Sequence, residues 1–396
     1  MLGLLLAVLA GIFLGLIAGI VPGLHPNTIA AILADLHLGT DTFPFVIIAI
    51  AAAATVFECL RAIFLYVPDT DTVLSLLPGH RMLMEGKGMS AVAICSFAFL
   101  LSSALALLLL PISFLVFPMI YSIIAPVTSY FLLALSIVLL ASERQVRKIA
   151  GALVCFCLAG VLGLIVFNYP VLREPLFPSF AGLFAISGLA LSMSPSQPIP
   201  GQNKAAPRAP LSLMPIIALG TVLAALADLL PGISSPAQIA VFASIFTYMN
   251  SERFLALTSS ISASHLIFAL SALLTIGKAR VGTIAIAGDA ASIISPAWVF
   301  AMAGAALLAI GIASLSLVPL ARRILPALQS AEPRTLNLLV LAYLFSLLYV
   351  TGGAPALLVA SVASFIGAAP QLLGVRRTHV MGFILVPSIA RLLLSV

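Results

Sequence analysis

Charged residues are scarce in this 396-residue sequence: they make up 8% of it, hydrophobic residues make up 62%, and the mean hydropathy is +1.25. An average soluble domain is about 25% charged and about 45–50% apolar. The shortage of charge therefore excludes a soluble enzyme, a nucleic-acid-binding protein and a secreted disulfide scaffold. The sequence predicts an all-α polytopic protein of the plasma membrane, embedded in the lipid bilayer from end to end.

Cysteine is rare, and basic residues are missing from the N-terminal region. Four cysteines lie inside apolar runs and predict packing, with no disulfide and no metal site: Cys59, Cys95, Cys155 and Cys157. The first basic residue is Arg61, so the N-terminus lacks the charged region of a secretory signal. We therefore expect residues 2–21 to form a retained first span.

Long apolar runs fill the sequence and predict ten to twelve membrane-spanning helices, at about 20 residues per span. Two runs, 112–140 and 284–319, exceed one span and contain prolines, so each predicts a kinked helix or two short ones. Short basic clusters separate the runs, as expected of cytoplasmic loops. The net charge of +6 is explained by this topology and implies no nucleic-acid partner.

A stretch rich in Pro, Gly and Ser divides the sequence into nearly equal halves. We expect a first repeat at 1–193, a polar linker at 194–212 and a second repeat at 213–396. Each half carries a Pro-Gly pair after an apolar run of about one span, at Pro22-Gly23 and at Pro231-Gly232. A second proline and an Ile-Ala pair follow in both copies, and this equivalent placement predicts an internal repeat.

The Pro-Gly pairs predict a broken or re-entrant helix in each repeat, because proline removes a backbone donor and glycine lets the chain turn. Pro26 suits the first position of the next helix. A helix start carries unpaired N–H groups and partial positive charge, so it can hold an anion. Ser and Asn in one copy alone would favour helix capping over a binding site. Paired breaks in corresponding positions of two halves reverse this and indicate the binding site of a secondary transporter. The predicted substrate-binding residues are Pro22, Gly23, His25, Asn27, Thr28, Pro231, Gly232, Ser234, Ser235 and Gln238.

Ionisable residues within the apolar runs are further candidates, because charge in lipid is costly. Asp228, three residues before the second Pro-Gly pair, and Asp289 are the predicted sites of coupling to Na⁺ or H⁺, with backbone capping as the alternative for Asp228. Glu58 and Arg61 are three residues apart and predict an intrahelical ion pair. His265 is more typical of a histidine packed in the core than of a member of a proton relay. No cofactor other than a coupling ion is expected.

Two stretches resemble a known family. Residues 15–24, which end in Pro22-Gly23-Leu24, are similar to the N-terminal signature of the TctA family, the large membrane subunit of tripartite tricarboxylate transporters. Residues 77–88 resemble the next block of that family, with matches at Gly79, Met82 and Gly86 and departures at Pro78, His80 and Arg81. These departures, and the His and Ser at the breaks, are typical of a divergent, archaeal-type, uncharacterised branch.

The resemblance implies a permease for a small anionic carboxylate, driven by an ion gradient, and not an enzyme. It also implies an extracytoplasmic binding protein and a small membrane subunit as partners. A homodimer and the relative orientation of the two repeats are left open by the sequence. The alternative function is transport of a polyprenyl-phosphate lipid carrier, since a phosphate headgroup suits the same helix starts.

Overall fold

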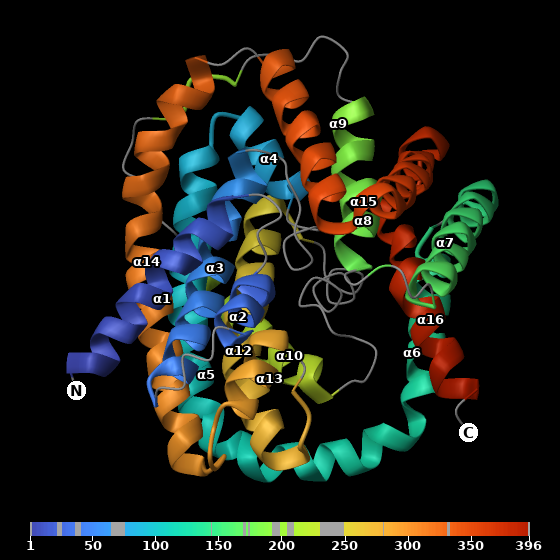
Figure 1. The fold of residues 1–396 in the computed structure, drawn as a ribbon. Helices are drawn as coiled ribbons and strands as arrows, with labels where there is room; N and C mark the ends of the chain where they lie inside the picture. Colours follow the sequence, from blue (N-terminus) through green and yellow to red (C-terminus); the bar gives the residue numbers. More distant parts are fainter. Residues whose placement is uncertain are drawn as a thin grey trace.

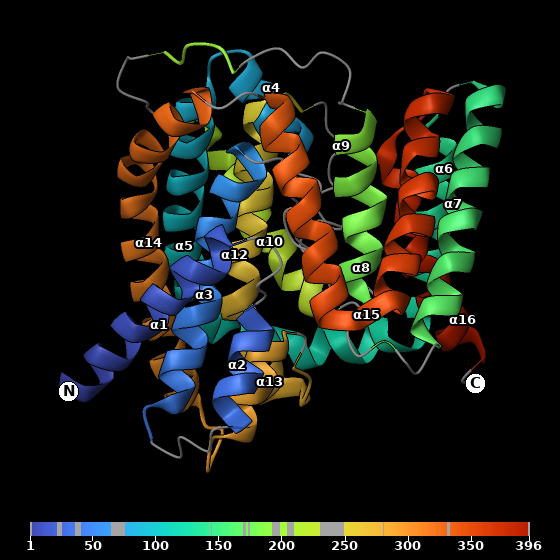
Figure 2. The same cartoon turned by 45° about the horizontal axis from the view of Figure 1, so that its top comes forward.

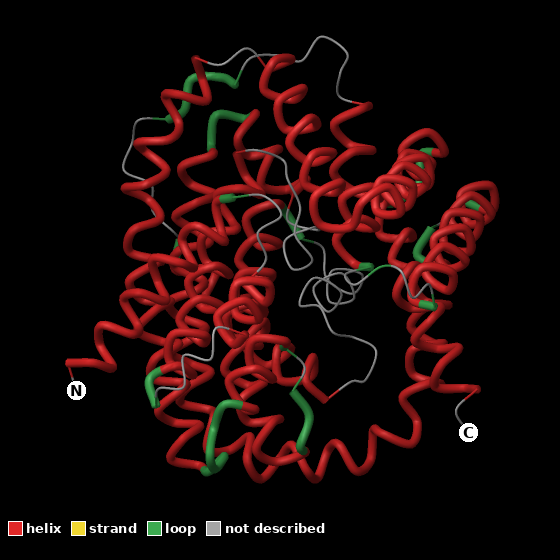
Figure 3. Tube along the Cα trace, in the orientation of Figure 1, coloured by secondary structure: helices red, strands yellow, loops and turns green. Residues whose placement is uncertain are grey.

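The chain is helical throughout the part that the structure describes, and no strand occurs there (Figure 3). The computed structural model describes residues 2–21, 26–35, 41–64, 76–143, 145–168, 172, 175–191, 199–203, 210–229, 249–279, 281–330 and 333–394. The predicted all-α fold is confirmed. Its physical reason is that lipid offers backbone groups no hydrogen-bond partner, so each membrane segment must pair its own N–H and C=O groups.

The helices of the first half precede the predicted linker. They are α1 (Leu2–Ile20), α2 (Pro26–Asp35), α3 (Phe43–Phe64), α4 (Leu76–Met84), α5 (Gly88–Ile124), η1 (Ala125–Val127), α6 (Thr128–Ala141), α7 (Val146–Phe167), α8 (Leu176–Phe180), η2 (Ala181–Ile186) and α9 (Ser187–Leu191). The second half contributes η3 (Leu211–Leu213), α10 (Met214–Leu229), α12 (Ser251–Ile276), α13 (Gly282–Asp289), α14 (Pro296–Ser330), α15 (Pro333–Leu373), η4 (Arg377–Met381) and α16 (Gly382–Leu394).

Seven stretches of the described helices are long and apolar enough to cross a membrane, which supports the predicted polytopic membrane protein. They are Leu2–Ile20, Phe43–Phe64, Gly88–Val127, Val146–Phe167, Ser251–Ile276, Pro296–Ala327 and Leu338–Leu373. Three shorter apolar helices accompany them: Ser129–Ala141, Leu176–Leu191 and Leu211–Leu226.

The predicted run 89–110 joins the start of the run 112–140, and the predicted runs 335–350 and 353–373 join each other, to form longer helices. The reason is that proline in an apolar setting bends a helix without always ending it. Helix α5 continues through Pro111 and Pro118, and the α-helix is interrupted only at η1, which contains Pro126. In α15, two helical pieces meet at Gly353, whose positive φ of 62° is a conformation that glycine adopts without strain. The run 284–319 instead divides into two helices, α13 and α14, but only α13 is short, since α14 has 35 residues.

The described helices form two groups that lie side by side (Figures 1 and 2). In the first group, α1, α3, α5, α10, α12 and α14 pack on one another. In the second, α6, α7 and α16 pack together, and α15 packs on α7, α8, η2 and α9. The ribbon of α5, η1 and α6 runs along the lower edge of Figure 1 from the first group to the second. Each half of the sequence therefore contributes helices to both groups.

Helices α3 and α12 form the centre of the first group and are buried along most of their length. Helix α1 packs on α3, and α10 packs on α12, so that in each half the helix before the Pro-Gly pair lies against a central helix. This arrangement is compatible with the predicted repeat. The repeat itself stays a prediction, because residues 230–248 lie outside the described residues.

Candidate functional site

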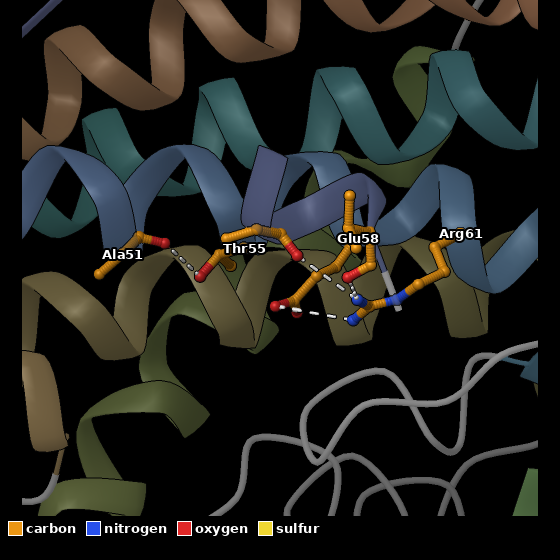
Figure 4. A network of polar contacts seen from close by, with 6 residues as sticks. Ala51, Thr55, Glu58 and Arg61 are labelled. Carbon is orange, nitrogen blue, oxygen red and sulfur yellow. Dashed lines mark hydrogen bonds and ion pairs between the residues drawn. The ribbon is translucent and has the colours of Figure 1, made fainter. Parts of the chain in front are cut away.

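The end of α1 is held by a side chain from α3. Arg61 is almost completely buried and donates from Nη1 to the carbonyl oxygens of Val21 at 3.1 Å and of Ala18 at 3.5 Å (Figure 4). The last carbonyls of a helix have no partner within the helix and carry partial negative charge, which a guanidinium stabilises. Arg61 therefore fixes α1 at the point where the chain enters the first Pro-Gly pair.

Arg61 also forms the predicted ion pair with Glu58. Its Nη2 lies 3.9 Å from Oε1 of Glu58, and both side chains are buried. The sequence prediction of an intrahelical pair is confirmed. The free energy needed to remove two charges from water is often as large as the free energy of their mutual attraction. A buried pair is therefore weak evidence for a role in stability alone. This pair is accordingly a functional candidate.

Close packing of α1 on α3 brings Arg61 within reach of the end of α1. Three glycines spaced by four residues face α3: a Cβ at Gly11, Gly15 or Gly19 would lie 2.6–2.7 Å from the Cβ of Ala49, Ala53 or Phe57 respectively. Glycine at these positions lets the two backbones approach more closely than any side chain would allow. The glycine-rich start of the sequence therefore has a packing role.

A small pocket lies between α3, α5 and α12, next to this ion pair. Its polar lining consists of Thr55, Glu58, Cys59, Cys95, Thr258, Ser259 and Ser262, and apolar side chains of the same helices complete it. The sequence alone did not predict this pocket. The run Thr258-Ser-Ser-Ile-Ser-Ala-Ser264 within an apolar helix was the signal that could have indicated it, since buried hydroxyls are uncommon without a partner or a ligand.

Asp228 and His265 form a buried pair between α10 and α12. The Nδ1 atom of His265 lies 3.2 Å from Oδ2 of Asp228, and both side chains are almost inaccessible. Asp228 stands in the last turn of α10, where the helix dipole disfavours a carboxylate, so a hydrogen bond from the imidazole offsets an unfavourable position. The structure thus brings together two residues that the sequence offered as separate candidates.

The other predicted residues are placed only in part. Helix α2 begins at Pro26, as predicted, and Asn27 in its first turn lies against Gly282 at the start of α13. Thr28 belongs to the same turn. Asp289 is the exposed last residue of α13. The remaining candidates lie outside the described residues: Pro22, Gly23, His25, Pro231, Gly232, Ser234, Ser235 and Gln238.

A second polar cluster joins two connections between helices in the second group. Oε1 of Glu143, between α6 and α7, accepts from the backbone N–H of Arg376 at 3.0 Å and lies 3.1 Å from Nε2 of His379 in η4. Burial lowers the pKa of His379, and this outweighs the opposing effect of Glu143. Burial would raise the pKa of Glu143, but the hydrogen bonds from Arg376 and His379 dominate and lower it. The cluster therefore pairs a carboxylate with a neutral imidazole.

The model of the tripartite tricarboxylate transporter TctA family matches residues 5–382, which is nearly the whole chain. An uncharacterised protein of the archaeon Methanocaldococcus jannaschii is 26% identical over 289 residues, which cover 71% of each chain. No solved structure gives a significant match.

TctA proteins are transporters and not enzymes, and the archaeal relative agrees with the divergent branch that the sequence departures indicate. With its apolar helices and its match from residue 5 to residue 382, this multi-pass plasma-membrane protein belongs to the tripartite tricarboxylate transporter TctA family.

Proposed function

We propose that this chain is the permease subunit of an ion-coupled secondary transporter for a small anionic carboxylate. The family supports the transporter class, because TctA proteins are the large subunits of tripartite tricarboxylate transporters. Partners of the kinds that serve this family, an extracytoplasmic binding protein and a small membrane subunit, would deliver the substrate and complete the complex. The substrate would bind at the helix starts that follow Pro22-Gly23 and Pro231-Gly232.

The observation that carries the proposal is the arrangement on both sides of the first Pro-Gly pair. Before it, Arg61 holds the end of α1; after it, α2 begins at Pro26. The start of a ten-residue helix offers unpaired N–H groups and partial positive charge to an anion. Asn27 in the first turn adds an amide that can donate to a carboxylate.

Ion coupling is assigned in this proposal to Asp228 and Asp289. The burial of Asp228 beside His265, three residues before the second Pro-Gly pair, supports a role for Asp228 in binding a cation or a proton. Asp289 is exposed at the break between α13 and α14. Transport of a polyprenyl-phosphate lipid is not favoured, because the family match points to carboxylates.

The proposal is tested with purified protein and with proteoliposomes. A thermal-shift panel of dicarboxylates, tricarboxylates and a polyprenyl phosphate should show stabilisation by at least one carboxylate. Replacement of Asn27 by Leu removes a hydrogen bond to a charged group, worth about 1.5–3 kcal/mol, and should weaken binding on the order of tenfold or more.

Asn168→Leu provides the matched control, because Asn168 is exposed at the end of α7 in the other group of helices. We expect this variant to bind the carboxylate like the wild type. If no carboxylate stabilises the wild-type protein, or if Asn27→Leu binds as tightly as Asn168→Leu, the proposed substrate site is wrong.

A further inference from the structure

Three hydroxyl oxygens in the pocket between α3, α5 and α12 can accept but not donate. Thr55 donates its hydroxyl hydrogen to the carbonyl oxygen of Ala51 at 2.9 Å. Thr258 donates to Phe254 and Leu255 at 3.1 Å, and Ser262 donates to Thr258 at 3.1 Å. A hydroxyl group has a single hydrogen, so these three side chains offer the pocket only lone pairs.

Glu58 adds a carboxylate to the same lining. Its two oxygens carry about four lone-pair positions, so one carboxylate can contact both Arg61 and a second cation. Arg61 is not part of the pocket lining, whereas Glu58 is. We propose that this pocket binds a small monovalent cation of the Na⁺ type through Glu58 and the hydroxyl oxygens of α3 and α12.

The donor set favours a monovalent hard cation over a divalent or soft one. Ca²⁺ and Mg²⁺ sites use carboxylates together with other oxygen ligands and, for Mg²⁺, several waters. Here one carboxylate, already facing an arginine, is the only acidic side chain in the described lining. Zn²⁺ and Cu⁺ prefer imidazole and thiolate ligands, and the described residues contain no group of three His, Cys, Asp or Glu that could hold a metal ion.

A cation bound in this pocket would change the electrostatic potential at the first Pro-Gly pair. Glu58 and Arg61 together carry no net charge, so a bound cation makes the group positive. The same Arg61 holds the end of α1 through Val21 and Ala18, directly before the predicted substrate site. A cation here should raise the affinity for an anionic substrate, and the substrate should raise the affinity for the cation by the same factor. This coupling role rests on the proposed function, whereas cation binding itself does not.

The experiment measures the thermal stability of the purified full-length protein while NaCl replaces choline chloride at constant ionic strength and pH, without carboxylate. A cation that binds only the folded protein raises the melting temperature in a saturable way. The melting temperature of the wild-type protein should rise with Na⁺ concentration. Glu58→Gln should lose the response, and Ser262→Ala should shift the half-saturating Na⁺ concentration on the order of tenfold upwards, as expected for one lost charge–dipole contact.

Ser260→Ala is the matched control. Ser260 is buried on the same helix and donates to Ala256, but it is not part of the pocket lining. It should respond to Na⁺ like the wild type. If Glu58→Gln does not elute as a folded protein in size-exclusion chromatography, the cation site is tested by comparing the Na⁺ response of Ser262→Ala with that of Ser260→Ala.

Two results would overturn the cation site: a wild-type protein that responds to pH but not to Na⁺, or a Na⁺ response that Glu58→Gln or Ser262→Ala retains unchanged. The carboxylate panel is read separately. A Na⁺ response that depends on Ser262, together with no carboxylate binding, would support the cation site and contradict the proposed function. Carboxylate binding without a Na⁺ response that depends on Ser262 would contradict the cation site alone.

Discussion

Replacement of Gly19 by Ala perturbs the contact that places α1 against α3. A Cβ at this position would lie 2.6 Å from the Cβ of Phe57, 2.9 Å from the carbonyl oxygen of Ala54 and 3.1 Å from the amide nitrogen of Glu58. Two of these atoms belong to the backbone of α3 and cannot rotate away. Helix α1 must therefore move.

The size of the movement follows from these distances. Ordinary van der Waals contact begins at 3.4 Å, so the end of α1 must shift outwards by about 0.8 Å. The hydrogen bond from Arg61 to Val21, now 3.1 Å long, would lengthen to roughly 3.9 Å and be lost. Overpacking costs about 1–3 kcal/mol, and a lost hydrogen bond to a charged group costs about 1.5–3 kcal/mol. We expect the free energy of unfolding to fall by about 2.5–6 kcal/mol.

The assay is a denaturation titration of the purified protein, accompanied by carboxylate binding. Gly3→Ala on the same helix is the control, because no atom lies within 4 Å of its added Cβ. Alanine has the higher helix propensity, so Gly3→Ala should be as stable as the wild type or slightly more stable. If Gly19→Ala is as stable as Gly3→Ala, the close approach of α1 and α3 is not a structural requirement and the assignment of Arg61 to the end of α1 fails with it.

Two other predictions concern titratable groups. Asp228→Asn keeps the shape of the contact with His265 but removes the charge. Transport in proteoliposomes should therefore continue down the substrate gradient and lose its dependence on an imposed Na⁺ or H⁺ gradient. An unaltered dependence would show that Asp228 does not couple an ion to transport. At the polar cluster of Glu143 and His379, the pKa of His379 is lower in the folded protein than in the unfolded chain, so the unfolded chain binds a proton at a higher pH. The contribution of His379 to the free energy of unfolding is therefore fully present above pH 6.5 and decreases as the pH falls below that value. The lowered pKa of Glu143 adds a further loss below pH 4.5. Thermal melts between pH 8 and 4 should show both steps, and His379→Gln should remove the upper one; an unchanged upper step in that variant would contradict the assignment.

Several local features could be predicted from the sequence because they depend on neighbours along the chain. The start of α2 at Pro26 follows from the fixed φ of proline and from its missing donor. The Glu58–Arg61 pair follows from the spacing of three residues on a helix. The division of the run 112–140 near Pro126 follows in the same way. The joining of predicted spans in α5 and α15 could not be predicted, because the effect of a proline in lipid depends on what packs against the bend.

Composition by itself determined that this protein lies in the membrane and is helical, because lipid forces every backbone group to be paired within a short distance along the chain. The tertiary structure decided which side chains meet. The Asp228–His265 pair, the pocket around Glu58 and the contact of Arg61 with the end of α1 all join helices that are far apart in sequence. Such contacts depend on how helix surfaces fit together, as Gly19 against Phe57 illustrates, and no periodicity within one helix encodes them.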